Sequence, residues 1–213
     1  MTNVSPKLQR AFLRAAHNGE TRIMEQLLSK ADDKHDKAYK KKIVGLPSNS
    51  MAFERKRLPR ENNKVSRHTS RFNLISVVDH RMRRSALHWA CKKGKFNAAK
   101  VALLHGIDPN AADINGQTAL HIVCKHRTLG KLLFLLLDHG SKLDIIDSNG
   151  YTPLMTATVN GNIDFVKVLL MYGANIYTET KIGFKRKTVI DLADEKKQES
   201  ILQLLLRYVY EHG

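Results

Sequence analysis

The 213-residue sequence is poor in cysteine, proline and tryptophan, with two, five and one residues respectively. Its apolar runs are short, and the leucine-rich block at 132–137 falls far below the roughly 18 residues that a membrane-spanning helix needs. The first seven residues lack the apolar core of a secretory signal. These absences predict a soluble protein of the cytoplasm, the nucleus or both, without a membrane partner.

Sequence patterns that carry chemistry are missing as well. The chain shows no nucleophile–base motif, no glycine-rich phosphate loop and no paired carboxylates of the kind that catalyse acid–base reactions. Cysteine pairs and Cys/His spacings typical of zinc sites are also missing. We therefore predict a protein that is not an enzyme and that binds no cofactor and no metal.

What the sequence does contain is a repeated unit, clearest at 147–173. Asn149-Gly150 is typical of a tight turn, and Thr152-Pro153 is typical of a helix start, because the hydroxyl caps free N–H groups and proline needs no donor there. Related helix starts precede and follow it, at Ser85, Thr118 and Thr188. The successive spacings are 33, 34 and 36 residues. A unit with one apolar side cannot bury that side alone, so the copies should stack.

This period, together with T-A-L-H at 118–121 and T-P-L at 152–154, resembles that of ankyrin repeats. The resemblance implies an all-α solenoid of helix-turn-helix units with β-hairpin-like fingers. About five copies are recognisable, and the outer two are degenerate caps. We predict an N-terminal capping repeat at 1–30, a basic insert at 31–71, repeats two to five at 72–213, and a monomer.

Two residue types recur at equivalent places. Cys91 and Cys124 both lie six residues after a helix start; stacked helices are about 8–10 Å apart and a disulfide needs Cα atoms within about 7 Å, so we predict buried free thiols in a reducing compartment. His88 and His121 both lie three residues after a helix start. The ankyrin resemblance implies that such a histidine bridges backbone and hydroxyl groups there, rather than binding a metal.

The first complete finger breaks the pattern in one place. Arg83 stands where the later fingers have Gly116 and Gly150. Glycine is the residue that readily adopts the left-handed conformation of such turns. We therefore predict that this finger is distorted and does not share the turn geometry of the others.

Net charge is +16, and most of the excess is concentrated in one segment. Between residues 34 and 84 there are 15 Lys and Arg against four acidic residues. The tracts Lys40-Lys41-Lys42 and Arg55-Lys56-Arg57 resemble nuclear-import or phosphate-binding sequences. One hypothesis is therefore a nuclear or nucleic-acid-associated cofactor that contacts nucleic acid non-specifically through 31–71; a solvated linker is the alternative.

Ankyrin arrays bind proteins through finger tips and the exposed side of the first helices, on their concave face. Carried over to this sequence, the resemblance implies contact residues that are basic near the N-terminus and more apolar further along. The finger positions are Arg81, Met82, Arg84, Ile114, Asn115, Gln117, Ser148, Asn149, Tyr151, Phe184, Lys185 and Lys187. The helix positions are Lys92, Lys93, Lys125, His126, Val159 and Asn160.

This pattern predicts an adaptor for an acidic partner segment with hydrophobic residues between its charges. A solubilising role for the lysines is the alternative. An inhibitor resembling the ankyrin regulators of Rel-type transcription factors is disfavoured, because those regulators present acidic surfaces to basic targets.

Overall fold

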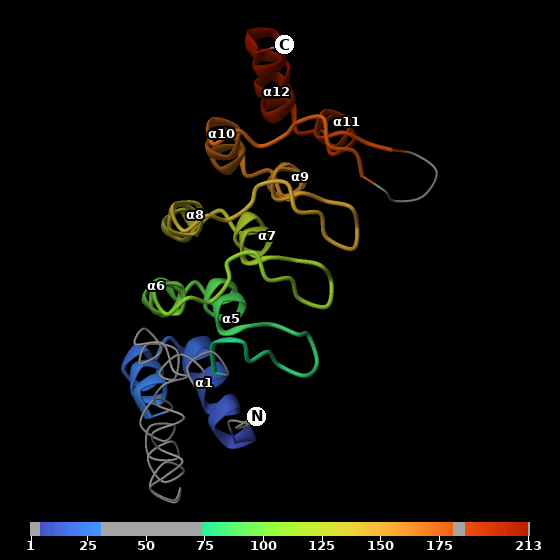
Figure 1. The fold of residues 1–213 in the computed structure, drawn as a ribbon. Coiled ribbons are helices and arrows are strands. Elements are labelled where there is room, and N and C mark those ends of the chain that lie inside the picture. Colours follow the sequence, from blue (N-terminus) through green and yellow to red (C-terminus); the bar gives the residue numbers. More distant parts are fainter. Residues whose placement is uncertain (1–4, 31–73, 181–185, 213) are drawn as a thin grey trace, which may run out of the picture.

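The computed structural model describes residues 5–30, 74–180 and 186–212. Helix pairs stack one above another, with a finger-like loop before the first helix of each later pair (Figure 1). The first helices are α1 (Pro6–Asn18), α5 (Ala86–Lys92), α7 (Ala119–Cys124), α9 (Pro153–Val159) and α11 (Val189–Glu195). The second helices are a segment at 21–30, α6 (Phe96–Leu104), α8 (Gly130–Asp138), α10 (Ile163–Met171) and α12 (Glu199–His212).

Helix starts lie where the sequence predicts them. The Thr152 hydroxyl accepts from the N–H of Met155 at 3.2 Å, and Pro153 takes the first helical position. The Ser5 hydroxyl caps α1 in the same way, ahead of Pro6. Within the described ranges no strand forms, and Val78 and Ser85 make an isolated antiparallel bridge. The expectation of an all-α ankyrin-type solenoid is confirmed.

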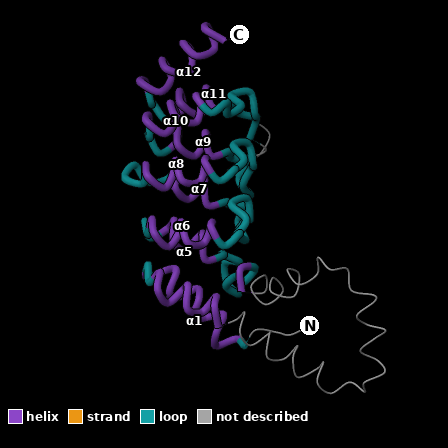
Figure 2. Tube along the Cα trace, turned by 60° about the vertical axis from the view of Figure 1, so that its left-hand side comes forward, coloured by secondary structure: helices purple, strands orange, loops and turns teal. Residues whose placement is uncertain are grey.

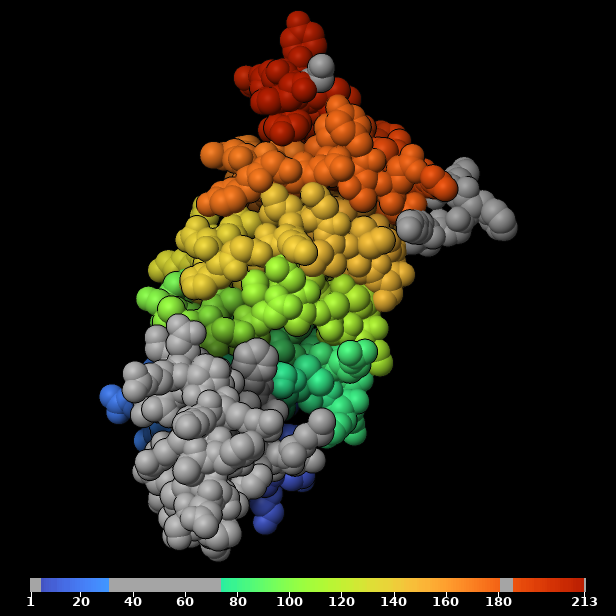
Figure 3. Space-filling model, viewed as in Figure 1, coloured from blue at the N-terminus to red at the C-terminus, as the bar shows by residue number. Residues whose placement is uncertain are grey.

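The first helices form one column, in which α5 contacts α1 and α7, and α9 contacts α7 and α11. The finger loops line one edge of this column (Figure 2), and successive repeats lie directly on one another (Figure 3). Leu87, Leu120 and Leu154 occupy equivalent positions two residues after the helix start and are fully buried. The core is thus one elongated cluster of buried side chains that runs from repeat to repeat.

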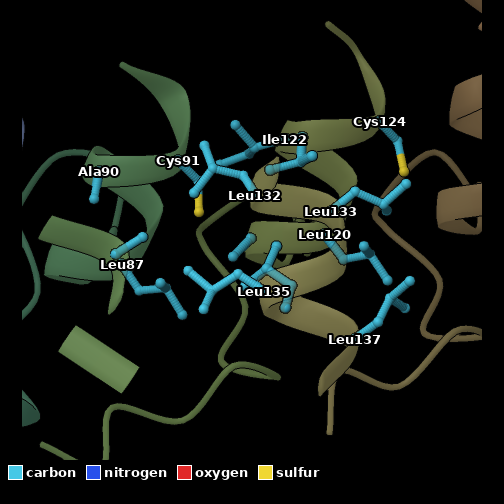
Figure 4. Close-up of a cluster of buried hydrophobic side chains, with 14 of the residues drawn as sticks. Leu87, Ala90, Cys91, Leu120, Ile122, Cys124, Leu132, Leu133, Leu135 and Leu137 are labelled. Carbon is cyan, nitrogen blue, oxygen red and sulfur yellow. The ribbon is translucent and has the colours of Figure 1, made fainter. Parts of the chain in front are cut away.

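Both cysteines lie in this cluster, Cys91 against the α5–α7 layer and Cys124 one layer further on (Figure 4). Both are free and fully buried, so the prediction of buried free thiols is confirmed. Burial raises the pKa of Cys91 to about 12 and also raises the pKa of Cys124. Neither thiol is therefore activated as a nucleophile.

The first finger corrects one prediction. Arg83 has φ 52°, close to the values of 70° and 71° at Gly116 and Gly150, so it does adopt the left-handed turn geometry that we expected it to avoid. The finger instead differs by one extra residue. The Asp79 N–H bonds to the carbonyl of Arg84, five residues on, whereas the Asp113 N–H bonds to that of Gln117, four residues on.

The Asp79 carboxylate holds this longer turn. It accepts hydrogen bonds from the N–H groups of Arg81, Met82 and Arg84 and from the indole of Trp89, at 2.7–3.1 Å. Burial alone would raise the pKa of Asp79, but these four donors outweigh it and hold the pKa below its usual value. The network explains how a non-glycine residue is kept at a positive φ.

At the other end, α12 continues past the point where earlier second helices stop. Gly106, Gly140 and Gly173 end those helices with positive φ, whereas Val209 stands at the matching place and stays helical. Ile201 and Leu205 are the buried residues of α12. In the described part of the chain, no helix combines the length and apolar character needed to cross a membrane. The insert at 31–71 and its boundaries lie outside the described residues, so the division of the chain remains a prediction.

Candidate binding face

His88 and His121 brace consecutive repeats. The Nδ1 atom of His121 accepts from the Thr118 N–H at 3.2 Å and lies 2.9 Å from its hydroxyl, while Nε2 contacts the Tyr151 carbonyl of the next repeat at 2.9 Å. His88 makes the same contacts with Ser85 and with the Gln117 carbonyl. The structural role implied by the resemblance is confirmed. In the described ranges, no group of His, Cys, Asp or Glu has the arrangement of a metal site.

These two histidines should make the array acid-sensitive. Burial lowers the pKa of both histidines below the ordinary value near 6.5. Their contribution to the free energy of unfolding is therefore present above pH 6.5 and is lost as the pH falls through the folded-state pKa. Urea unfolding at pH 7, 6 and 5 should show a falling free energy of unfolding. His121→Met introduces the residue type that a later repeat has at the equivalent position, Met155. This variant should lose less stability between pH 7 and pH 5 than the wild-type protein. Identical slopes for the two proteins would contradict the assignment.

A ladder of side chains joins the fingers. Arg84 Nε bonds to Asp113 Oδ2 at 3.0 Å, and one repeat further Gln117 Nε2 bonds to Asp147 Oδ2 at 3.0 Å. Each aspartate also accepts backbone N–H groups of its own finger. Lys125 Nζ donates to Oε1, the oxygen of the same Gln117 amide, at 2.9 Å. The ladder uses finger side chains to hold neighbouring fingers at a defined distance.

Because of this ladder, two of the predicted contact residues are buried. Arg84 and Gln117 are both 7% exposed, because their side chains reach across to the next finger rather than outward. Neither is free to act as a primary contact for a partner. Their removal should act first on the stability of the array.

Trp89, the single tryptophan, organises the basic end of this surface. The Arg84 guanidinium lies 5.6 Å and the Lys92 ammonium 5.4 Å from its ring centroid, and the edge of His17 approaches to 5.3 Å between centroids. Burial and the nearby charges of Arg84, Lys93 and Lys125 lower the pKa of Lys92, and Asp113 acts in the opposite direction. The structure therefore brings these cations from two repeats within electrostatic range of one another.

We define the finger face as the fingers together with the exposed sides of α5, α7, α9 and α11. Most of the proposed contact residues are exposed or half-buried on it. The exposed ones are Arg81, Lys92, Lys93, Ile114, Asn115, Lys125, His126, Ser148, Asn149 and Asn160. The half-buried ones are Met82, Tyr151, Val159 and Lys187. Phe184, Lys185 and the tracts at 40–42 and 55–57 lie outside the described residues.

Sequence reasoning missed the aspartates that hold the fingers of this face together. Asp79, Asp113 and Asp147 recur at a spacing of 34 residues, and each accepts backbone hydrogen bonds within its own finger. That spacing was available as a signal. Glu195, which forms an ion pair with Lys187, had no comparable signal.

Comparison with known proteins agrees with this geometry. A model of ankyrin repeats, in three copies, matches residues 68–145, 87–180 and 124–212. The chain is 32% identical over 126 residues to Tyrosine-protein kinase HTK16 of Hydra vulgaris, across 58% of this chain and 16% of the kinase. It is 36% identical over 84 residues to the Ankyrin repeat protein OPG189 of Variola virus, across 39% and 15%.

A further relative is the B-cell lymphoma 3 protein homolog of Mus musculus, 26% identical over 143 residues, which cover 50% of this chain and 32% of the relative. The matched stretch thus spans less than a third of each of these relatives. Ankyrin repeats generally mediate protein–protein interaction, so a protein partner is the general expectation. By the extent of the repeat match and by its helix pairs and fingers, the chain belongs to the ankyrin repeat family.

Proposed function

We propose that this chain is a non-enzymatic adaptor whose finger face binds an acidic segment of a partner protein. The observation that carries the proposal is a group of cations on one surface. The Lys92 ammonium lies 5.4 Å from the Trp89 ring that Arg84 also approaches, and the charges of Lys93 and Lys125 act on Lys92. Like charges held close together repel one another, and an acidic ligand relieves that repulsion. Complementary charge also accelerates association.

Asp79 and Asp113, which bond to Trp89 and Arg84, are already engaged. Asp79 accepts four hydrogen bonds within and beside its own finger, and Asp113 accepts from Arg84 and from two backbone N–H groups. Lys92 and Lys93 are both exposed. Their charge is therefore presented at the surface, where it can meet a partner.

Apolar side chains lie further along the same face. Ile114 is 56% exposed at a finger tip, and Tyr151 and Val159 are half-buried in the fourth repeat of the column. Half-buried aromatic and aliphatic side chains suit the centre of an interface, because they lose their remaining water on binding without a large loss of rotamer freedom. A partner segment with acidic residues followed by apolar ones fits this order.

Charge reversal tests the proposal. Lys92→Glu with Lys93→Glu should weaken binding of a captured partner about tenfold or more, since two attractive contacts become repulsive. The matched control is Lys100→Glu with Lys131→Glu, which makes the same change of net charge on exposed positions of α6 and α8. The control should bind normally. Equal binding by both variants, or an equal loss in both, would exclude a specific basic site.

The other expectations remain proposals. A monomer in the cytoplasm or nucleus fits this adaptor role. The alternative cofactor role through 31–71 depends on residues outside the described part of the chain, and no contact on the finger face favours it.

A further inference from the structure

One pair of positions recurs in every repeat of the finger face. The first member directly precedes the helix start, and the second lies seven residues after the start. The four pairs are Arg84 with Lys92, Gln117 with Lys125, Tyr151 with Val159, and Lys187 with Glu195. We call them the face pairs, numbered one to four from the N-terminal end.

Side-chain contacts place the members of three face pairs close together, and the third pair occupies the equivalent positions. Lys125 Nζ donates to Gln117 Oε1 at 2.9 Å, and Lys187 Nζ forms an ion pair with Glu195. Arg84 and Lys92 approach the same Trp89 ring. Since α5 contacts α7, α7 contacts α9 and α9 contacts α11, the face pairs follow one another along the column (Figure 1).

Internal pairing leaves a graded surface. In face pair one the Arg84 charge is matched by Asp113, which leaves Lys92. Face pair two presents Lys125, whose partner Gln117 is neutral. Face pair three is apolar, and in face pair four the lysine and the glutamate offset each other. From face pair one to face pair four, the exposed character is therefore positive, positive, apolar and neutral.

This order sets the chemistry and the spacing of what can bind. Stacked helices are about 8–10 Å apart, and an extended chain advances about 3.3–3.6 Å per residue, so one repeat corresponds to about three residues of an extended ligand. We propose that the partner contributes an extended segment with an acidic residue, a second acidic residue three positions away and an apolar residue three positions beyond. The acidic residues contact Lys92 and Lys125, and the apolar residue contacts Tyr151 and Val159. This inference rests on the proposed function and deepens it.

A nucleic acid fits the same surface less well. A phosphate backbone needs positive charge along its whole track, whereas here the charge stops after face pair two. The Trp89 ring, moreover, is approached by Arg84, Lys92 and His17 and is not an open stacking platform. An extended protein segment uses both the charged and the apolar parts of the face.

The spacing can be read directly by selecting 16-residue peptides from a displayed random library on the full chain. The expected enrichment is acidic–x–x–acidic–x–x–apolar, in that order or its reverse. Acidic residues enriched at a seven-residue spacing would indicate a helical ligand, because a helix rises about 1.5 Å per residue, and would overturn the extended geometry. Selection without acidic enrichment would overturn the proposed function itself. Preferential retention of single-stranded DNA over the selected peptides would favour a nucleic-acid face and overturn both.

A charge-swap experiment tests the register. We call the acidic residue nearer to the apolar one the inner acidic residue, and the other the outer one. Lys125→Glu should weaken binding of the selected peptide about tenfold, and replacing the inner acidic residue by lysine should restore binding. The same peptide change should not restore binding to the Lys92→Glu variant. For that variant, binding should return only when the outer acidic residue is replaced by lysine. Equal rescue from either peptide position would overturn the fixed register. Lys100→Glu, on α6, serves as the charge control.

Lys125→Glu also removes a hydrogen bond to Gln117, so its thermal unfolding is measured alongside. If that variant fails to fold, Lys125→Met takes its place. It should weaken the selected peptide several-fold and leave unchanged a peptide whose inner acidic residue is already glutamine. Equal weakening of the two peptides would show that the lysine does not contact that residue.

Discussion

Arg84→Ala is expected to destabilise the array by about 3 kcal/mol in urea unfolding. The Asp113 side chain is 0% exposed, and Arg84 Nε at 3.0 Å is its cationic partner. Removing the guanidinium leaves a buried carboxylate that accepts two backbone hydrogen bonds and has no cation in direct contact. The loss is expected even though Arg84 has the appearance, in the sequence, of one more surface cation.

The double-mutant cycle with Asp113→Asn isolates this pair. In the Asp113→Asn background, Arg84→Ala should cost clearly less, because no charge is left uncompensated. A cost of less than about 1 kcal/mol for Arg84→Ala in the wild-type background would show that Asp113 does not depend on it. Peptide binding measured well below the unfolding transition would then separate an effect on stability from an effect on the face.

Gly116→Ala is expected to cost about 3 kcal/mol, and Gly106→Ala only about 1–2 kcal/mol. Both glycines have a positive φ, 70° and 86°, so both variants carry the left-handed penalty. Only Gly116 also lies against the next finger, where an added Cβ would stand 3.0 Å from the Ser148 nitrogen and 3.1 Å from the Asp147 Cα. Gly106 has no atom within 4 Å of that position.

The difference between the two variants measures the finger-to-finger approach, because the backbone penalty is shared. If both variants lost the same free energy of unfolding in chemical denaturation, moving the fingers apart would have no energetic cost. The Ser148 N–H donates to the Asn115 carbonyl at 2.8 Å, so a displaced finger should also show faster amide exchange at Ser148. Unchanged exchange in Gly116→Ala would contradict a displacement.

The first finger shows how a residue-level rule was overridden. Arg83 was expected to avoid a glycine-type turn, and it adopts φ 52°. The cost of that conformation is local and small, about 1–2 kcal/mol, whereas Asp79 satisfies four donors only if the turn closes in this way. A propensity argument about Arg83 alone could not include the hydrogen bond from the Trp89 indole to Asp79, two residues ten positions apart.

The same contrast holds for the face. Lys92, Lys93 and Lys125 were identified as exposed cations from their repeat positions, and they are exposed. Arg84 and Gln117, identified by the same reasoning, are buried because each bonds to an aspartate about thirty residues further along the chain. Position within a repeat predicts the direction of a side chain, but not whether its end meets water or a neighbouring finger.

Sequence alone determined the period, the helix starts, the bridging histidines and the ankyrin-type stack, because each depends on contacts within a repeat or between identical positions of adjacent ones. Tertiary structure decided which charges are used internally. Arg84 is matched by Asp113 and Lys187 by Glu195, while Lys92 and Lys125 keep their charge for the surface. The physical reason is that the pairing of a charge depends on distances between side chains, which exist only after the repeats have stacked.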